Sequence, residues 1–88
     1  MRIHISRTGG FAGIERHAEI DTTDRPDAAE WQALADRAMS AAHTEPPTGV
    51  PDGFRYTLTV DGKTAYCSDP HLTDAQRELI DLVLKEGS

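Results

Sequence analysis

Hydrophobic and polar residues alternate with a period of two over residues 2–7 and again over residues 14–20. Such alternation is typical of a strand that buries one face, because successive side chains point to opposite sides. The two segments therefore predict a hairpin whose tip lies between them. Arg16 falls on the apolar side of its strand, so we expect either that it extends along the sheet edge to water or that the register differs there.

A hairpin symmetric about its central glycine–phenylalanine bond would bring the apolar faces of both strands together. Its cross-strand pairs would be Arg2 with Glu19, His4 with His17 and Ser6 with Glu15. The two facing histidines, flanked by carboxylates, are the best candidates for a metal site in this chain, since two His and a carboxylate suffice to bind zinc. The simpler interpretation is that both are solvated residues on an open sheet face.

The periodicity changes after the polar connector 21–27, where apolar residues at i, i+3, i+4 spacing predict a helix that runs to about Ala42. Its inward stripe consists of Trp31, Leu34, Ala35, Ala38, Met39 and Ala42. Asp24 or Asp27 can cap its N-terminus, and Asp27-x-x-Glu30 has the spacing of a capping box. Residues 43–53 hold three of the five prolines and predict an exposed loop.

Alternation returns most regularly over residues 54–60, and Asp61-Gly62 predicts a two-residue type I′ turn into a strand over 63–67. A second capping box, Thr73-x-x-Gln76, begins a final helix. The buried stripe of that helix is Ala75, Leu79, Ile80 and Val83. The order ββαββα predicts one α+β domain over residues 1–88, a two-layer fold with a four-stranded mostly antiparallel sheet and both helices on one face.

The expected path of the chain places three loops at one end of this sheet. If the first helix returns toward the Gly-rich hairpin tip, and the second and third strands run in the same direction, the proline-rich loop shares that end with the tip. Ser68-Asp69-Pro70 then lies there as well. Asp21 and Asp24 fall at the opposite end.

Composition narrows the function classes. The 15 acidic and 9 basic side chains give a net charge of −6, which has the wrong sign for nucleic acid or anionic membranes. A domain of 88 residues buries only about 60–65% of its unfolded surface and has no room for a large enclosed active site. The single cysteine, Cys67, is expected in the core. With neither a signal segment nor a long apolar run, we expect a cytoplasmic protein.

The sequence contains no H-E-x-x-H, nucleophile elbow, Walker loop or Rossmann fingerprint. Gly9-Gly10-x-x-Gly13 lies between two strands and not before a helix, so no helix N-terminus would complete an anion site. We therefore expect no enzyme activity and no cofactor. Phe11, framed by these glycines, is instead typical of a side chain offered to a partner, because hairpin tips normally carry polar residues. The alternative is that Phe11 folds back as a plug over the open end of the core.

Three segments resemble the emfourin family: Arg7-Thr-Gly-Gly-Phe-Ala-Gly-Ile14, Ile20-Asp-Thr22 and Pro51-Asp-Gly-Phe-Arg-Tyr56. Emfourins are small bacterial protein inhibitors of thermolysin-like zinc metallopeptidases, the protealysin group. The resemblance covers nearly the whole chain in length and element order. It implies a cytoplasmic inhibitor that blocks its target non-covalently.

Such a target holds zinc beside an apolar pocket, which Phe11 could fill. The resemblance also implies an aspartate that replaces the zinc-bound water, and the expected topology nominates Asp69 or Asp52, although both also suit ordinary turns. The predicted partner-binding residues are Gly9, Gly10, Phe11, Ala12, Gly13, Val50, Asp52 and Asp69. The competing hypothesis is a regulatory interaction module, either monomeric or weakly dimeric through an exposed sheet face.

Overall fold

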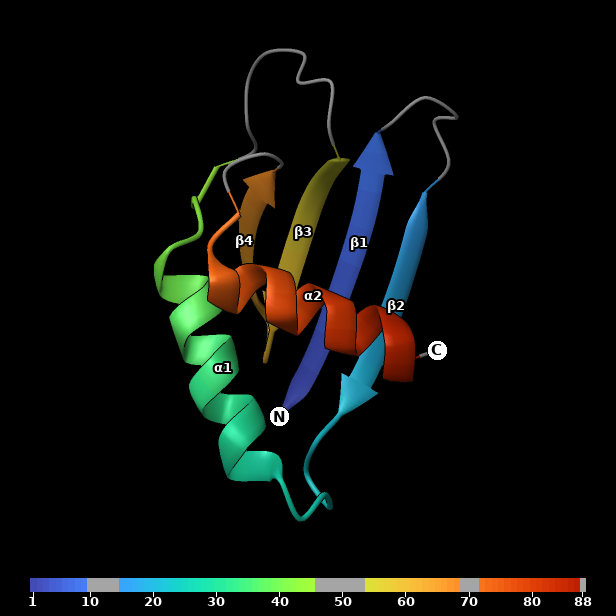
Figure 1. Cartoon of the computed structure of the whole chain (residues 1–88), viewed down its shortest axis with the longest axis vertical. Coiled ribbons are helices and arrows are strands. Elements are labelled where there is room, and N and C mark those ends of the chain that lie inside the picture. Colours follow the sequence, from blue (N-terminus) through green and yellow to red (C-terminus); the bar gives the residue numbers. More distant parts are fainter. Residues whose placement is uncertain (10–14, 46–53, 69–71, 88) are drawn as a thin grey trace.

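The computed structural model describes residues 1–9, 15–45, 54–68 and 72–87, and its two layers are an antiparallel sheet and a pair of helices packed on one sheet face (Figure 1). In chain order the elements are β1 (Arg2–Gly9), β2 (Arg16–Asp21), α1 (Ala28–Ser40), β3 (Phe54–Val60), β4 (Lys63–Ser68) and α2 (Asp74–Glu86). The predicted α+β class, with four strands and two helices, is confirmed.

The sheet order is β2-β1-β3-β4, and every neighbouring pair is antiparallel. Strands β2 and β3 therefore run in the same direction, as predicted, with β1 between them. The two central strands supply the most deeply buried side chains, since Ile3, Ile5 and Leu58 are 0% exposed. Cys67 lies in the same core, as expected.

The predicted register of the first hairpin is wrong by two residues. The structure pairs Arg2 with Asp21, His4 with Glu19, and Ser6 with His17. A shift of two leaves every side chain on its face, so the hydrophobic pattern alone cannot detect it. The observed register sets Ile5 opposite Ala18, whereas the predicted one would have set Ile5 opposite Arg16, and the apolar pair packs better on the buried face.

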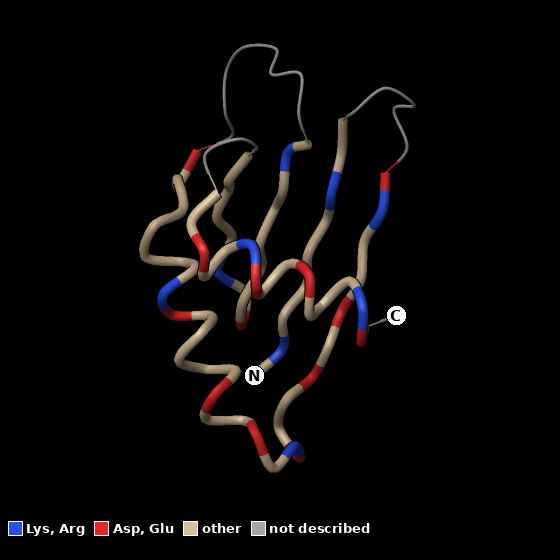
Figure 2. Tube along the Cα trace, viewed as in Figure 1, with Lys and Arg blue, Asp and Glu red and all other residues tan. Residues whose placement is uncertain are grey.

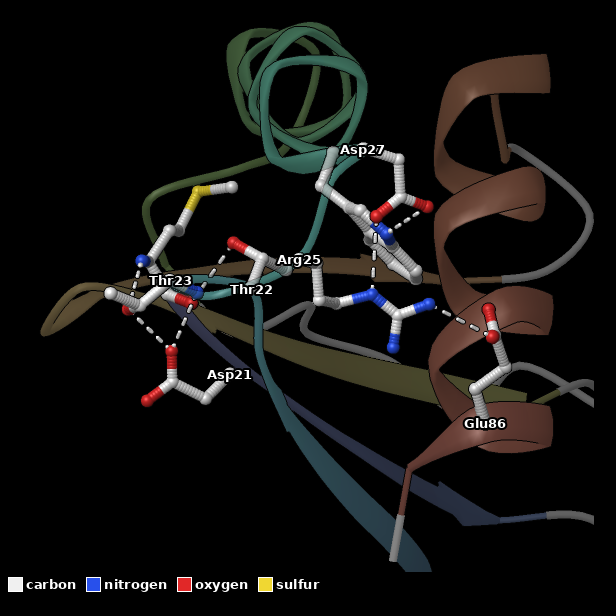
Figure 3. Close-up of polar contacts among 8 residues, drawn as sticks. Asp21, Thr22, Thr23, Arg25, Asp27 and Glu86 are labelled. Carbon is white, nitrogen blue, oxygen red and sulfur yellow. Dashed lines mark hydrogen bonds and ion pairs between the residues drawn. The ribbon is translucent and has the colours of Figure 1, made fainter.

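The predicted capping box of α1 does not form. Asp27 is the N-cap residue, but its side chain caps no backbone N–H. Its carboxylate instead accepts hydrogen bonds from Trp31 Nε1 at 3.1 Å and from Arg25 Nε at 3.2 Å. Arg25 also donates to Glu86 Oε1 at 3.1 Å, so the connector is joined to the end of α2 (Figure 3). The Asp27 carboxylate therefore takes part in tertiary hydrogen bonds and not in the N-terminal cap that the sequence pattern predicted.

The Asp27 network predicts a pH dependence of stability. Desolvation works to raise the pKa of Asp27, but hydrogen bonds from Arg25 and Trp31 outweigh it and hold the pKa below its ordinary value of 3.8. A depressed carboxyl pKa contributes stability that is present above the unfolded value and is lost as pH falls through the folded one. Asp27→Asn should therefore have a lower Tm than the unmodified protein at neutral pH, with the gap closing below pH 3.8.

Thermal unfolding followed by circular dichroism from neutral pH down to about pH 2.5 checks this expectation. Asp36→Asn is the matched control, because Asp36 is an exposed carboxylate on the same helix. Its substitution should leave the Tm at neutral pH close to that of the unmodified protein, because the structure gives the Asp36 side chain no hydrogen bond or ion pair among the residues it describes. A gap for Asp27→Asn that stays constant to the lowest pH would contradict the ionic role.

The second capping box is confirmed. Gln76 N donates to Thr73 Oγ1 at 3.1 Å, and Thr73 N donates to Gln76 Oε1 at 3.0 Å. Gln76 is also 1% exposed, and its Nε2 donates to the carbonyl of Ala38 in α1. The helical stripe did not predict this buried polar residue, which joins the two helices. Positive φ angles at Asp61 (50°) and Gly62 (84°) match the predicted type I′ turn.

Candidate functional site

All four strands have one end at the same edge of the sheet, at the top of Figure 1. Gly9, the last residue of β1, pairs with Phe54, the first residue of β3. The described residues that form this region are called the strand-end edge: Arg7, Gly9, Arg16, Phe54, Arg55 and Ser68. The predicted site residues lie at these strand ends or shortly before or after them in the sequence.

Gly9 is a predicted site residue that the structure describes. Its φ of +99° lies in a region that L side chains rarely adopt, so a glycine is favoured where β1 ends. The remaining predicted residues lie outside the described residues: Gly10, Phe11, Ala12, Gly13, Val50, Asp52 and Asp69. The structure therefore fixes the place from which the hairpin tip departs.

The strand-end edge also gives the spacing between the flanks of the predicted loops. Ser68 of β4 pairs with Arg55 of β3, which in turn pairs with Thr8 of β1. Thr8 and Ser68 are thus two strand spacings apart, roughly 10 Å, and Gly9 is the residue after Thr8. Phe11 follows Gly9 by two residues, Asp52 precedes Phe54 by two, and Asp69 follows Ser68 directly.

Two arginines lie on the helix-facing side of the strand-end edge. Sequence analysis did not single out Arg7, and it left two alternatives open for Arg16. The Arg7 guanidinium lies 4.3 Å from the centroid of the Phe54 ring, and its Nε is buried without a hydrogen-bond partner. Arg16 Nη2 donates to the carbonyl of Leu84 at 2.9 Å, near the C-terminus of α2. The register does differ, but the shift of two leaves Arg16 on the helix-facing side, and its side chain extends past the core to the end of α2. Arg7 lies on the same side of its strand as Ile3 and Ile5, and this alternation could have identified it as an arginine on the helix-facing side.

The opposite end of the sheet holds structural contacts. Asp21 lies there, as the predicted topology requires, and is opposite Arg2 and not, as the predicted register would have it, beyond the Arg2–Glu19 pair. Its Oδ1 accepts hydrogen bonds from Thr23 N at 2.9 Å and from Thr23 Oγ1 at 2.6 Å. Those hydrogen bonds lower the pKa of Asp21. Thr22 is 1% exposed and donates its N–H to the carbonyl of Met1 at 2.8 Å (Figure 3). The Ile20-Asp-Thr22 segment thus anchors the N-terminus.

His4 and His17, the two candidate metal ligands, lie on neighbouring strands but are not directly opposite each other in the register. The ring centroids of His4 and His17 are 5.8 Å apart, although His4 is opposite Glu19 in the register. His17 Nε2 lies 3.9 Å from Glu15 Oε1, and both side chains are 60% exposed. Within residues 1–9, 15–45, 54–68 and 72–87, no group of three or more His, Cys, Asp or Glu side chains is arranged to hold a metal ion.

Comparison with known protein families identifies the class. The Emfourin family model matches residues 5–84, which include the strand-end edge, all of α1 and most of α2, and this chain belongs to the emfourin family. No curated protein and no solved structure matches the chain. Among the described segments, no helix is both long enough and apolar enough to cross a bilayer.

Proposed function

We propose that this protein inhibits thermolysin-like zinc metallopeptidases of the protealysin type by inserting its Gly-rich hairpin tip into the active-site cleft. Membership of the emfourin family over residues 5–84 is the observation that carries this proposal. The strand-end edge supports it, because the flanks of the three loops expected to enter the cleft lie on neighbouring strands. The chain itself catalyses nothing in this role.

Phe11 is the proposed anchor of the inhibitor. A thermolysin-like site has an apolar pocket beside the zinc, and an aromatic side chain buried at the centre of an interface contributes a large share of binding energy. Gly10 and Gly13 flank Phe11 in the sequence and carry no side chains that would hinder entry into a narrow cleft. Ala12 and Val50 would add apolar contact at the rim.

An aspartate is proposed as the ligand that displaces water from the zinc of the target. Carboxylate oxygens bind zinc at about 2.0–2.2 Å, so the ligand must come from a loop that enters the cleft together with Phe11. Asp52 precedes the strand that pairs with β1, whereas Asp69 follows β4, one strand further away. Both remain candidates, and substitution decides between them.

Steady-state inhibition of a protealysin-like or thermolysin-like peptidase tests the proposal. The unmodified protein should inhibit competitively with substrate. Asparagine keeps the shape of aspartate but loses the anionic ligand, so one of Asp52→Asn and Asp69→Asn should weaken inhibition by about 10–100-fold. The other should change it less than about threefold and serves as the matched control. No inhibition of several such enzymes would overturn the proposed function.

The alternative of a regulatory interaction module makes a different prediction for the same preparation. The sheet face away from the helices carries polar residues such as Thr57, Thr59 and Thr64, and the hydroxyls of Thr59 and Thr64 lie 3.3 Å apart. A module that dimerises through this face would show a concentration-dependent mass in light scattering and no effect on any metallopeptidase. A constant monomer mass together with inhibition would exclude it.

A further inference from the structure

The strand-end edge carries three arginines that have no carboxylate partner among the residues that the structure describes. The described ion pairs of arginine engage Arg2 and Arg25, both at the other end of the sheet. Arg7, Arg16 and Arg55 form none within these segments. Glu15, which is next to Arg16 in the sequence, lies 3.9 Å from His17 instead. In a chain with 15 acidic and 9 basic side chains, carboxylates are in excess, so this lack of pairing is not due to a shortage of acids.

Arg7 and Arg16 are also directly opposite each other across β1 and β2. Like charges in this position repel and destabilise a sheet. Arg7 gains a contact with the Phe54 ring at 4.3 Å but leaves its buried Nε without a hydrogen bond. Arg16 gains only a backbone carbonyl. A like-charge pair and a buried donor without a hydrogen bond both destabilise the folded chain, and such local violations are typical of functional sites.

Charge is distributed unevenly along the sheet. Figure 2 shows Lys or Arg near the upper ends of β1, β2 and β3, with an acidic residue next to the one on β2, and most Asp and Glu of the sheet layer around the connector from β2 to α1 at the lower end. The basic residues at the lower end are accompanied by acids, as in the 3.6 Å pair between Arg2 and Glu19. The strand-end edge of a protein with a net charge of −6 therefore gathers three arginines, next to Glu15 and to the chain positions that lead to Asp52 and Asp69. Arginines at the end of a sheet can steer the carboxylates of a partner during diffusional encounter.

We propose that Arg7, Arg16 and Arg55 dock on carboxylate side chains of the protein partner, which for the function proposed above are acidic residues on the rim of the peptidase cleft. This inference rests on that proposed function. The guanidinium group forms paired hydrogen bonds with carboxylates and stays charged at every physiological pH. Arg7 and Arg16 lie on the helix-facing side of the sheet and Arg55 on its open side, so the arginines would contact the rim on both sides of the hairpin tip while the tip occupies the cleft.

Association rates of two charge-reversal variants test the proposal. Arg55→Glu places a negative charge at the strand-end edge, and Lys63→Glu makes the same change of net charge at the other end of the β3–β4 hairpin. Both residues are exposed, so both variants should fold. At about 50 mM salt, Arg55→Glu should slow association with the peptidase about tenfold, and Lys63→Glu less than threefold. The difference should shrink at about 500 mM salt, where screening shortens the range of the charges.

Arg7→Met provides a second readout that a merely structural arginine would not give. Methionine keeps an apolar stem over Phe54 and removes both the repulsion with Arg16 and the unsatisfied Nε. The Tm should stay the same or rise while inhibition weakens. A fall in Tm with unchanged inhibition would overturn the inference.

Equal slowing by Arg55→Glu and Lys63→Glu would also overturn it, because net charge alone would then be responsible. So would association that neither variant slows. In these cases the unmodified protein still inhibits, and the proposed function stands. If the unmodified protein inhibits no such peptidase, the proposed function fails and this inference fails with it.

Discussion

Leu58→Ala is expected to lower the free energy of unfolding by about 3–5 kcal/mol, the largest loss of stability from any single truncation proposed for this chain. Leu58 is 0% exposed on the central strand β3, where it lies opposite Ile5 of β1 and Ala65 of β4. Neighbours on both sides hold the backbone in place, so the cavity left by the missing side chain cannot collapse. A domain of this size has about 5–10 kcal/mol in total, and the variant would be only marginally folded.

Urea denaturation followed by circular dichroism measures the loss. Thr59→Ala is the matched control, because the next residue of the same strand points to the open face, where its hydroxyl meets Thr64 at 3.3 Å. Its cost should stay below about 1 kcal/mol. Equal losses for Leu58→Ala and Thr59→Ala would contradict the assignment of the buried face.

The features that sequence predicted well depend on neighbouring residues. Strand β3 spans Phe54–Val60, as its alternation predicts, and the Asp61-Gly62 turn adopts positive φ at both residues. The capping box of Thr73 and Gln76 likewise needs only residues three apart. In each case the sequence contains both partners of the interaction within a few positions, so tertiary structure has little to add.

The features that sequence missed depend on distant residues. The register of the first hairpin was ambiguous by two, since either choice buries the same face. Asp27 does not form its predicted cap, because its carboxylate accepts hydrogen bonds from Trp31 and Arg25. The Arg25 guanidinium also donates to Glu86, near the C-terminal end of the chain. Arg7 meets Phe54 only because β1 and β3 are adjacent, which the predicted order of elements did not establish. At the candidate site, sequence identified the tip glycines, whereas the grouping of Arg7, Arg16 and Arg55 at the ends of three strands required the fold.

Phe11→Ala is expected to weaken inhibition of the target peptidase by about 30–1000-fold, which corresponds to roughly 2–4 kcal/mol of binding free energy. The proposed reason is the loss of an aromatic side chain from an apolar pocket, where the transfer from water supplies most of the energy. Phe11→Leu is the matched variant, because it keeps a large apolar group and should recover inhibition to within about tenfold of the unmodified protein. Inhibition constants for the three proteins on one peptidase measure both effects.

Stability of the same variants separates a partner-binding Phe11 from one that plugs the open end of the core. A side chain that leaves its own domain to enter a partner contributes little to folding, so Phe11→Ala should change the free energy of unfolding by less than about 0.5 kcal/mol. A plug would cost about 3–5 kcal/mol on truncation, and inhibition would then fall only with the folded fraction. Weak inhibition by a fully stable Phe11→Ala protein therefore supports insertion of the tip. Full inhibition by that protein would remove Phe11 from the site and leave the contact with the target to the loop aspartates and the arginines of the strand-end edge.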